Sequence, residues 1–269
     1  MAAPPTTRPI LRWHGGKWRL ADWIISHLPN HKVYVEPFGG AASVLLKKPR
    51  SYCEVYNDLD GEVVNLFHVA RTQGERLREL LELTPFARDE FTASYEHTED
   101  PLERARRTVV RSFMGFGSNA HNKATGFRSN SNRSGTPPAR DWRNYPSAFV
   151  ATIDRLRGVV IENRDATAVM HAHDAEETVH YVDPPYVAST RDGGSDYRHE
   201  MSDSDHIQLA ETLHKLRGAV VLSGYRCKLY DEMYGAWRRI EKSTYACGAA
   251  PRTECLWLSP RCCAGELFA

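Results

Sequence analysis

Short runs rich in β-branched and aromatic residues alternate with helical patterns along most of this chain, and no other feature restricts its fold as strongly. The strand-like runs lie at 33–36, 52–56, 159–162, 179–182 and 218–223. Apolar residues recur at helical spacing between them, most clearly over 202–216, where Ser202 can cap the helix. Strands that alternate with helices of this length pair in parallel and are covered by helices. We therefore expect an α/β fold with a doubly wound, mostly parallel sheet.

A segment from residue 71 to residue 145 interrupts this alternation. Helical patterns follow one another there without strands between them, at 75–83, 88–97 and 101–114. The stretch 115–138 contains 14 Gly, Ser, Asn or Pro among its 24 residues, with three basic and no acidic residues. We expect it to be a mobile polar loop without a core of its own. The chain is thus expected to divide into an inserted, mainly helical domain at 71–145 and one α/β domain formed by 1–70 and 146–269.

Charge is distributed unevenly between this insertion and the rest of the chain. The whole sequence has 35 basic and 34 acidic residues, a net charge of +1. Residues 104–143 contain nine basic residues and one acidic residue, a local balance of +8 that leaves −7 for the remainder. A local excess of this size attracts a polyanion such as nucleic acid, whereas the alternative is an ordinary solvated basic surface.

Composition excludes several classes of protein. With 41% hydrophobic and 26% charged residues, the chain is typical of globular proteins. It has no run of about 18 apolar residues that could cross a bilayer, and its first residues lack the apolar core of a secretory signal. We therefore expect a cytoplasmic protein that does not bind membranes. The six cysteines show no repeated CxxC spacing, so we expect reduced thiols and no bound metal.

A glycine turn and an acidic residue follow the first two strand-like runs. Gly39 and Gly40 stand where a turn lets a cofactor approach the backbone of an open α/β sheet. Asp58 lies 18 residues after Gly40, and an acid there can accept hydrogen bonds from both hydroxyls of a ribose. Tight packing and helix capping could also explain these residues. A nicotinamide site would be expected to have the third glycine of a GxGxxG pattern, which is absent.

The tetrapeptide Asp183-Pro184-Pro185-Tyr186 directly follows the strand-like run at 179–182. Its prolines remove two backbone donors and stiffen the chain, which leaves the Asp183 carboxylate and the Pro184 carbonyl as acceptors beside the Tyr186 ring. An amino group on a planar base can donate to both acceptors while its ring stacks on the tyrosine. The alternative is a rigid proline turn after a buried strand.

These motifs and their order resemble those of the Dam-like, D12 class family of DNA adenine methyltransferases over nearly the whole chain. The resemblance lies in residues 12–17 (RWHGGK), 35–41 (VEPFGGA), 57–67, 183–186 (DPPY) and 252–257 (RTECLW). It implies a Rossmann-like methyltransferase fold in which the helical insertion is the target-recognition domain. It also implies transfer of a methyl group from S-adenosylmethionine to the 6-amino group of adenine in double-stranded DNA, by base flipping and direct attack of the amine. The Gly-Gly-Ala turn departs from the spaced glycines of the family, and 115–130 matches its base-reading hairpin only loosely.

The resemblance also assigns roles to individual residues of this chain. Those expected to hold the cofactor are Trp13, Lys17, Phe38, Gly39, Gly40, Asp58, Asp165 and Asp183. Those expected to engage the flipped adenine are Asp183, Pro184 and Tyr186. The basic segment offers candidate DNA contacts, namely phosphate contacts from Arg106 and Arg107, a guanine contact from Arg128, and further contacts from Lys123 and Arg133. Trp13 could instead be a core aromatic residue, and Lys17 a surface lysine.

Other functions use similar residues. An RNA adenine or protein side-chain amino methyltransferase, a catalytically inactive DNA-binding relative and a nicotinamide oxidoreductase are the alternatives. The insertion between the cofactor and catalytic motifs favours DNA over RNA, and the presence of Lys17 and Asp183 favours an enzyme. We expect a monomer whose partner is double-stranded DNA, with a cognate restriction endonuclease as a candidate second partner.

Overall fold

A seven-stranded sheet with the order β3-β2-β1-β4-β5-β7-β6 forms the centre of the computed structural model, which describes residues 5–117, 124–129, 135–191, 197–245 and 251–263. The strands are β1 (Val33–Glu36), β2 (Cys53–Asn57), β3 (Val159–Glu162), β4 (Thr178–Val182), β5 (Ala219–Gly224), β6 (Arg238–Tyr245) and β7 (Pro251–Leu258). Strands β1 to β5 pair in parallel, whereas β7 is antiparallel to both β5 and β6. The predicted doubly wound, mostly parallel sheet is confirmed. The sequence patterns do not predict the edge strand β6, because most of its residues are polar.

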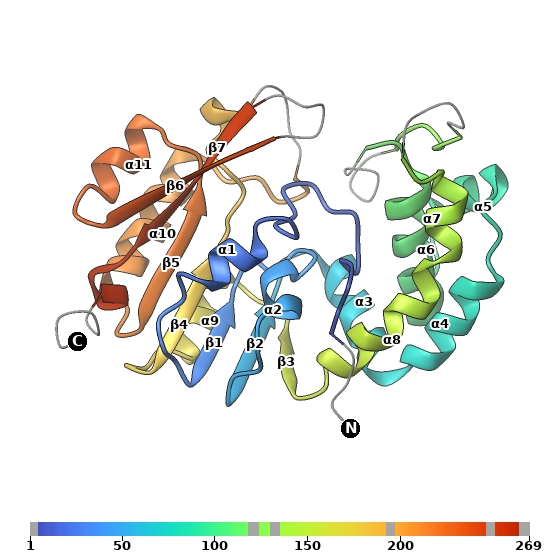
Figure 1. Cartoon of the computed structure of the whole chain (residues 1–269), viewed down its shortest axis with the longest axis horizontal. Coiled ribbons are helices and arrows are strands. Elements are labelled where there is room, and N and C mark those ends of the chain that lie inside the picture. The colour runs from blue at the N-terminus through green and yellow to red at the C-terminus, as the bar shows by residue number, and fades with distance from the viewer. Residues whose placement is uncertain (1–4, 118–123, 130–134, 192–196, 246–250, 264–269) are drawn as a thin grey trace.

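Helices surround the sheet and also form a separate cluster at one end of it (Figure 1). The helices around the sheet are α1 (Ala21–Ile25), α2 (Ser43–Lys47), α3 (Gly61–Thr72), α9 (Ala166–Ala172), α10 (Asp203–Lys215) and α11 (Lys228–Met233). The cluster contains α4 (Gly74–Leu83), α5 (Arg88–Ala93), α6 (Pro101–Met114), α7 (Pro138–Arg143) and α8 (Tyr145–Arg155). Short 3-10 turns occur at η1 (Ala188–Thr190) and η2 (Pro260–Cys263). Among the described residues no helix is long and apolar enough to cross a membrane.

Local capping explains where two of these helices begin. Ser202 caps α10 in a reciprocal arrangement with Asp205, as the sequence predicts. Asp100 accepts a hydrogen bond from the amide of Leu102, and Pro101 occupies the first turn of α6.

One hydrophobic core joins the sheet to the helical cluster. It extends from Tyr34 on β1 through Phe67 on α3 to Phe113 on α6, and each of these side chains is buried. The helical cluster is therefore packed on the sheet through α3.

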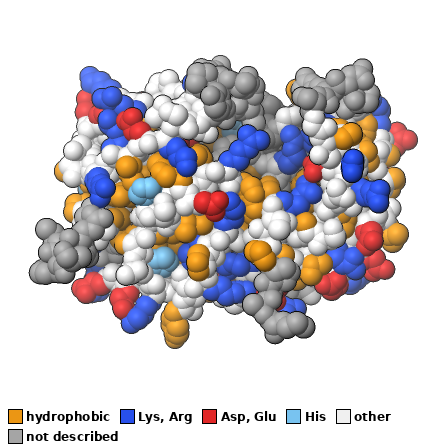
Figure 2. Space-filling view, viewed as in Figure 1, with side chains coloured by type: hydrophobic (Ala, Val, Ile, Leu, Met, Phe, Trp, Pro, Cys, Tyr) orange, Lys and Arg blue, Asp and Glu red, His pale blue; other side chains and the backbone are white. Residues whose placement is uncertain are grey.

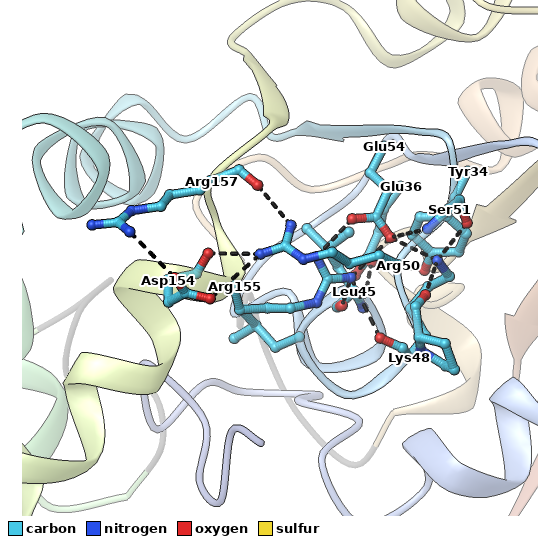
Figure 3. Close-up of polar contacts among 12 residues, drawn as sticks. Tyr34, Glu36, Leu45, Lys48, Arg50, Ser51, Glu54, Asp154, Arg155 and Arg157 are labelled. Atoms are coloured by element: carbon cyan, nitrogen blue, oxygen red, sulfur yellow. Dashed lines mark hydrogen bonds and ion pairs between the residues drawn. The ribbon is translucent and has the colours of Figure 1, made fainter. Parts of the chain in front are cut away.

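A buried group of charged residues ties the last helix of the cluster to the sheet (Figure 3). Arg155, at the end of α8, donates hydrogen bonds to both oxygens of Glu54 on β2, at 2.6 and 2.8 Å, and to the Leu45 carbonyl at 2.6 Å. Lys48 approaches the same carboxylate at 2.7 Å. The chain thus returns from the helical cluster to β3 at a point fixed by three buried charges.

The described part of the polar stretch 115–138 is packed more closely than the sequence predicts. Phe127 forms a β-bridge with Gly115, and its ring centroid lies 5.1 Å from Phe86 and 5.9 Å from Phe91. The expectation of a loop without core contacts is wrong at Phe127, because this one aromatic residue packs against the helices. The predicted helix 88–97 also ends early, at Ala93, where the Ser94 hydroxyl donates to the Phe91 carbonyl.

Candidate active site

A cavity of about 400 Å³ opens where the strand order reverses between β1 and β4. In doubly wound sheets, ligands bind beyond the carboxyl ends of the strands at this reversal. The lining comes from residues that follow β1, β2 and β4, from the amino-terminal segment 13–17 and from the segment 197–201. These segments, several of them far apart in the sequence, therefore meet at one place with residues 164–167, which follow β3.

The glycine turn after β1 is shaped by its neighbours. A side chain at Gly39 would come within 2.1 Å of the Tyr56 ring, and one at Gly40 within 2.5 Å of Trp13 Nε1. Gly40 also has a positive φ of 47°, a conformation that favours glycine. The two glycines are thus required by close packing against Tyr56 and Trp13, and both line the cavity with Trp13 and Phe38.

Asp58 follows β2 and faces the same cavity. Its Oδ2 accepts a hydrogen bond from the Gly40 amide at 2.7 Å, and its Oδ1 accepts one from the Asp60 amide at 2.8 Å. A carboxylate has about four acceptor positions, so each oxygen can accept a further hydrogen bond. Burial raises the pKa of Asp58 to about 6. The carboxylate is therefore placed and oriented as an acceptor for a ligand.

Asp165 also lines the cavity, at the start of α9. Its Oδ1 accepts hydrogen bonds from the Ala168 amide, at 2.9 Å, and from the Thr167 hydroxyl. Capping of α9 accounts for this geometry, and Oδ2 stays available for a ligand.

The Asp-Pro-Pro-Tyr motif follows β4. Asp183 and Pro185 line the cavity, whereas Pro184 and Tyr186 are buried beside them, with 6% of Tyr186 exposed. Lys17 Nζ lies 2.9 Å from Asp183 Oδ1 and 4.7 Å from the centroid of the Tyr186 ring. The same ammonium donates a hydrogen bond to the Gly15 carbonyl at 2.8 Å. Lys17 is therefore a buried partner of Asp183 rather than a surface lysine.

Two further carboxylates belong to this site although the sequence motifs do not single them out. Glu254 on β7 accepts hydrogen bonds from the Tyr186 and Ser223 hydroxyls and lies 3.8 Å from Lys17 Nζ. Glu36, at the end of β1, lines the cavity, and burial raises its pKa to about 8. An acid within or at the end of a buried strand is the signal that could have identified both, because an acid is rarely buried without a specific partner.

Burial alone would lower the pKa of the Lys17 ammonium. The carboxylates of Asp183 and Glu254 outweigh that effect and raise the pKa above its ordinary value. Lys17 therefore stays charged between the two acids.

Among the predicted DNA-contacting residues that the structure describes, none lines the cavity. Arg106 pairs with Glu103 at 2.7 Å and with Glu90 at 2.8 Å, and Arg107 pairs with Glu103 at 2.7 Å. The two guanidiniums would have to leave these ion pairs to bind phosphate. Arg128 donates a hydrogen bond to the Phe113 carbonyl at 2.9 Å, whereas Lys123 and Arg133 lie outside the described residues.

The basic excess of 104–143 is partly compensated in space. Arg104 and Arg111 approach Glu62 on α3, at 2.6 and 3.8 Å, in addition to the pairs formed by Arg106 and Arg107. On the face drawn in Figure 2, Lys and Arg side chains are scattered over both parts of the molecule, with acidic side chains among them. The expected electrostatic footprint is therefore weaker than the count of +8 suggests, because the count leaves out Glu103 at the start of α6 and the acids Glu62 and Glu90 on neighbouring helices.

Comparison with known proteins agrees with this geometry. Residues 13–245 match the family described as D12 class N6 adenine-specific DNA methyltransferase. The chain belongs to this family. It is 26% identical to the Type II methyltransferase M.MjaIII of Methanocaldococcus jannaschii over an alignment of 259 residues. This alignment covers 84% of this chain and 88% of the relative. It is also 26% identical to the DNA adenine methylase of Serratia marcescens, over 84% of this chain and 87% of the relative.

The DNA adenine methylase of Haemophilus influenzae is 32% identical over a shorter stretch, 40% of this chain and 41% of the relative. The resemblance seen in the sequence motifs is confirmed, and the protein is an adenine-specific DNA methyltransferase. Its substrate is DNA, and its reaction requires a methyl donor. Within the described residues, no cluster of three or more His, Cys, Asp or Glu side chains could hold a metal ion.

Proposed function

We propose that this D12 class enzyme transfers the methyl group of S-adenosylmethionine to the 6-amino group of an adenine that has rotated out of double-stranded DNA. One observation carries the proposal: Asp183, the Gly39-Gly40 turn and Asp58 line the same cavity. A methyl donor held by the turn and Asp58 would then lie next to an amino group held by Asp183. Alignment of the two reactants accounts for a large part of the rate in such transfers.

The charge of the cavity supports a cationic cofactor. Its lining contains more acidic than basic side chains even without Glu36, whose pKa of about 8 keeps it largely protonated at neutral pH. The acids are Asp58, Asp60, Asp165, Asp183, Glu200 and Asp205, against the basic residues Lys17, Arg164 and Arg198. This excess suits a sulfonium and an ammonium group. When bound, S-adenosylmethionine supplies a methyl group that is activated by its positively charged sulfur.

Individual residues would then hold different parts of the cofactor. Asp58 has acceptor positions left for the ribose hydroxyls, beyond its bonds to Gly40 and Asp60. Phe38 would contact the cofactor's adenine ring, and Asp165 would accept a hydrogen bond from its amino group. Gly39, Gly40 and Trp13 would shape the wall beside them, and Lys17 and Asp183 would lie at the methyl end.

The target base would be held on the opposite side of the methyl group. Asp183 and the Pro184 carbonyl would accept the two hydrogens of the amino group and direct its lone pair towards the methyl. Both hydrogen bonds strengthen as positive charge develops on the nitrogen, so they favour the transition state over the ground state. An adenine that stacks on the Tyr186 face covered by Lys17 has to take the place of that ammonium.

DNA recognition is proposed for the helical insertion, residues 71–145. Lys123, Arg128 and Arg133 belong to its polar stretch and would contact the DNA. Phe116 lies at the start of this stretch, 51% exposed, and its backbone amide donates to the Gly126 carbonyl at 2.7 Å. An exposed aromatic ring on an anchored backbone is suited to fill the space that a flipped base vacates. We also propose that the enzyme acts as a monomer, and a cognate restriction endonuclease is a candidate partner.

The test combines product analysis with one variant. The wild-type enzyme, incubated with duplex DNA and S-adenosylmethionine carrying a tritiated methyl group, should yield labelled 6-methyladenine in the digested nucleosides. Asp183→Ala should lose this activity while keeping its melting temperature and most of its DNA affinity, because it removes an acceptor used in the transition state. Label in RNA but not in DNA, or a variant as active as the wild type, would contradict the proposal.

A further inference from the structure

One buried cation, the ammonium of Lys17, lies between two carboxylates at the active site. Lys17 Nζ is 2.9 Å from Asp183 Oδ1 and 3.8 Å from Glu254 Oε1. The side chains of Lys17 and Glu254 are 7% and 4% exposed, and that of Asp183 is 17% exposed. Water therefore does little to weaken the interactions among the three charges.

Glu254 is also connected to the Asp-Pro-Pro-Tyr motif by hydrogen bonds. Its Oε1 accepts from the hydroxyl of Tyr186 and, at 3.0 Å, from the hydroxyl of Ser223 on β5. The two hydroxyls are themselves 3.0 Å apart. Burial raises the pKa of Glu254, whereas the Lys17 ammonium and the hydrogen bonds from the two hydroxyls act in the opposite direction and favour the ionised carboxylate. The Glu254 carboxylate thus restrains Tyr186 by accepting a hydrogen bond from the Tyr186 hydroxyl, and its negative charge attracts Lys17.

We propose that Glu254 is a positioning residue for methyl transfer, which orients the Tyr186 ring and serves as the second partner of Lys17 when the adenine amino group binds Asp183. The inference rests on the proposed roles of Asp183 and Tyr186. In the resting enzyme, Lys17 lies closer to Asp183. When the base arrives, its amino hydrogens compete for the Asp183 carboxylate and its ring competes for the Tyr186 face.

Competition for Asp183 would leave the Lys17 ammonium without its nearest partner, and Glu254 lies where it can replace that partner. A buried ammonium displaced from Asp183 without another partner would be strongly destabilised. Glu254 is already within reach, so Lys17 can shift towards it and remain paired. The three charged groups then carry a net negative charge beside the amino nitrogen, where positive charge develops during the reaction.

The inference predicts that removing the charge of Glu254 slows methyl transfer without weakening the binding of S-adenosylmethionine or DNA. Glu254→Gln keeps the size of the side chain and removes its charge. We expect the single-turnover rate of methyl transfer to fall by about tenfold or more, with dissociation constants for S-adenosylmethionine and duplex DNA within about twofold of wild type. Glu241→Gln is the matched control, because Glu241 pairs in register with Cys255 on the neighbouring strand and is 45% exposed. The control should keep the wild-type rate.

A double-mutant cycle tests the connection to Tyr186. Tyr186→Phe removes the hydroxyl and keeps the ring, so the double variant with Glu254→Gln should lose less than the product of the two single losses. Ser223→Ala removes one of the two hydroxyls that hold Oε1 of Glu254 in place, so the carboxylate should orient Tyr186 and Lys17 less well, and this variant provides the test should Glu254→Gln fail to fold. We expect Ser223→Ala to lower the rate by about two- to fivefold, with cofactor affinity unchanged.

Three results would overturn the inference: a Glu254→Gln rate within about twofold of wild type, strictly multiplicative losses in the cycle, or, where Glu254→Gln does not fold, a wild-type rate for Ser223→Ala. If instead the wild-type enzyme formed no 6-methyladenine, or Asp183→Ala were fully active, the proposed function itself would fail. A Glu254→Gln enzyme at wild-type rate, together with an inactive Asp183→Ala, would remove only the role of Glu254.

Discussion

The backbone amide of Gly40 donates a hydrogen bond to Oδ2 of Asp58 at 2.7 Å, which joins the turn after β1 to the acid after β2. The two residues are 18 positions apart in the sequence, and each follows one of two adjacent parallel strands. The bond orients the Asp58 carboxylate towards the cavity and holds the glycine turn beside it. Binding of a nucleoside cofactor should therefore depend on the charge of Asp58.

Cofactor affinity should rise with pH through the titration of Asp58. Burial raises the pKa of Asp58 to about 6, and only the ionised form accepts hydrogen bonds from both ribose hydroxyls at full strength. The dissociation constant of S-adenosylmethionine, measured by calorimetry, should thus fall between about pH 5 and pH 7. Asp58→Asn should weaken binding, by about 1.5–3 kcal/mol per hydrogen bond to the charged group, and flatten the profile.

Asp165→Asn is the control for this profile. The Thr167 hydroxyl lowers the pKa of Asp165, so this acid is ionised throughout the same range. Its replacement should weaken binding without removing the pH dependence. An Asp58→Asn enzyme with the wild-type profile would show that Asp58 does not face the cofactor.

Phe116→Ala should impair base flipping. Without the ring, the vacated space in the duplex loses stacking worth about 1–3 kcal/mol, so methylation of a fully paired site should slow. The free energy needed to rotate out a mismatched adenine is smaller than for a paired one, so Phe116→Ala should slow methylation of a mismatched site less than that of a paired site. Fluorescence of 2-aminopurine at the target position reports the extruded base directly.

Tyr52→Ala serves as the comparison for Phe116. Tyr52 is 91% exposed and precedes β2, at the edge of the sheet opposite the carboxyl ends that form the cavity. This variant should behave as wild type on both substrates. Equal slowing of Phe116→Ala on paired and mismatched sites would argue against a role in flipping.

Arg106 and Arg128 should respond differently to replacement by alanine. Arg106 is held by Glu103 and Glu90, so Arg106→Ala should lower the free energy of unfolding by about 1–3 kcal/mol and change the salt dependence of DNA binding little. Arg107, which also pairs with Glu103, should follow Arg106. If Arg128 reads a guanine, Arg128→Ala should cost about 1–3 kcal/mol on the cognate site and relax methylation at one base position.

Thermal unfolding, salt titrations and profiles of methylated sites separate these outcomes. A salt slope that flattens by about one unit in Arg106→Ala would show that this guanidinium does contact phosphate. An unchanged site profile for Arg128→Ala would exclude its reading of a base.

Glu54→Gln should be among the most destabilising single changes in the α/β part. It leaves Arg155 and Lys48 buried without their shared carboxylate, and removing one partner of a buried pair costs about 3–5 kcal/mol. Burial alone would raise the pKa of Glu54, but the hydrogen bonds from Arg155 and Lys48 outweigh it and lower the pKa. The stability from this carboxylate is therefore present above the unfolded pKa, about 4.3, and is lost as the pH falls through the lower folded value.

Urea unfolding at neutral and acidic pH measures both effects. Glu177→Gln is the control, because the Glu177–Lys32 pair has a similar distance, 2.7 Å, but a carboxylate that is 61% exposed. It should change stability by less than about 1 kcal/mol. A Glu54→Gln enzyme as stable as this control would show that the buried group contributes little.

The sequence by itself determined the alternation of the parallel strands β1 to β5 with helices, the glycine turn, the acids after β2 and β4, and the family. These features depend on local patterns: apolar periodicity sets each element, and parallel strands bring their carboxyl ends to one edge of a sheet. The predicted roles of Asp58 and Asp183 rest on that rule, and the structure places both residues in one cavity.

Only the tertiary structure decided which charges meet. Tyr186 and Glu254 are 68 residues apart, and Arg104 and Glu62 are 42 residues apart. Counting charges along 104–143 cannot include Glu62 or Glu90, so the count overstates the basic surface. Likewise, no local pattern identifies β7 as the source of a carboxylate for the Asp-Pro-Pro-Tyr motif. The physical reason is that the free energy of a buried charge depends on partners brought close by packing, whatever their distance along the chain.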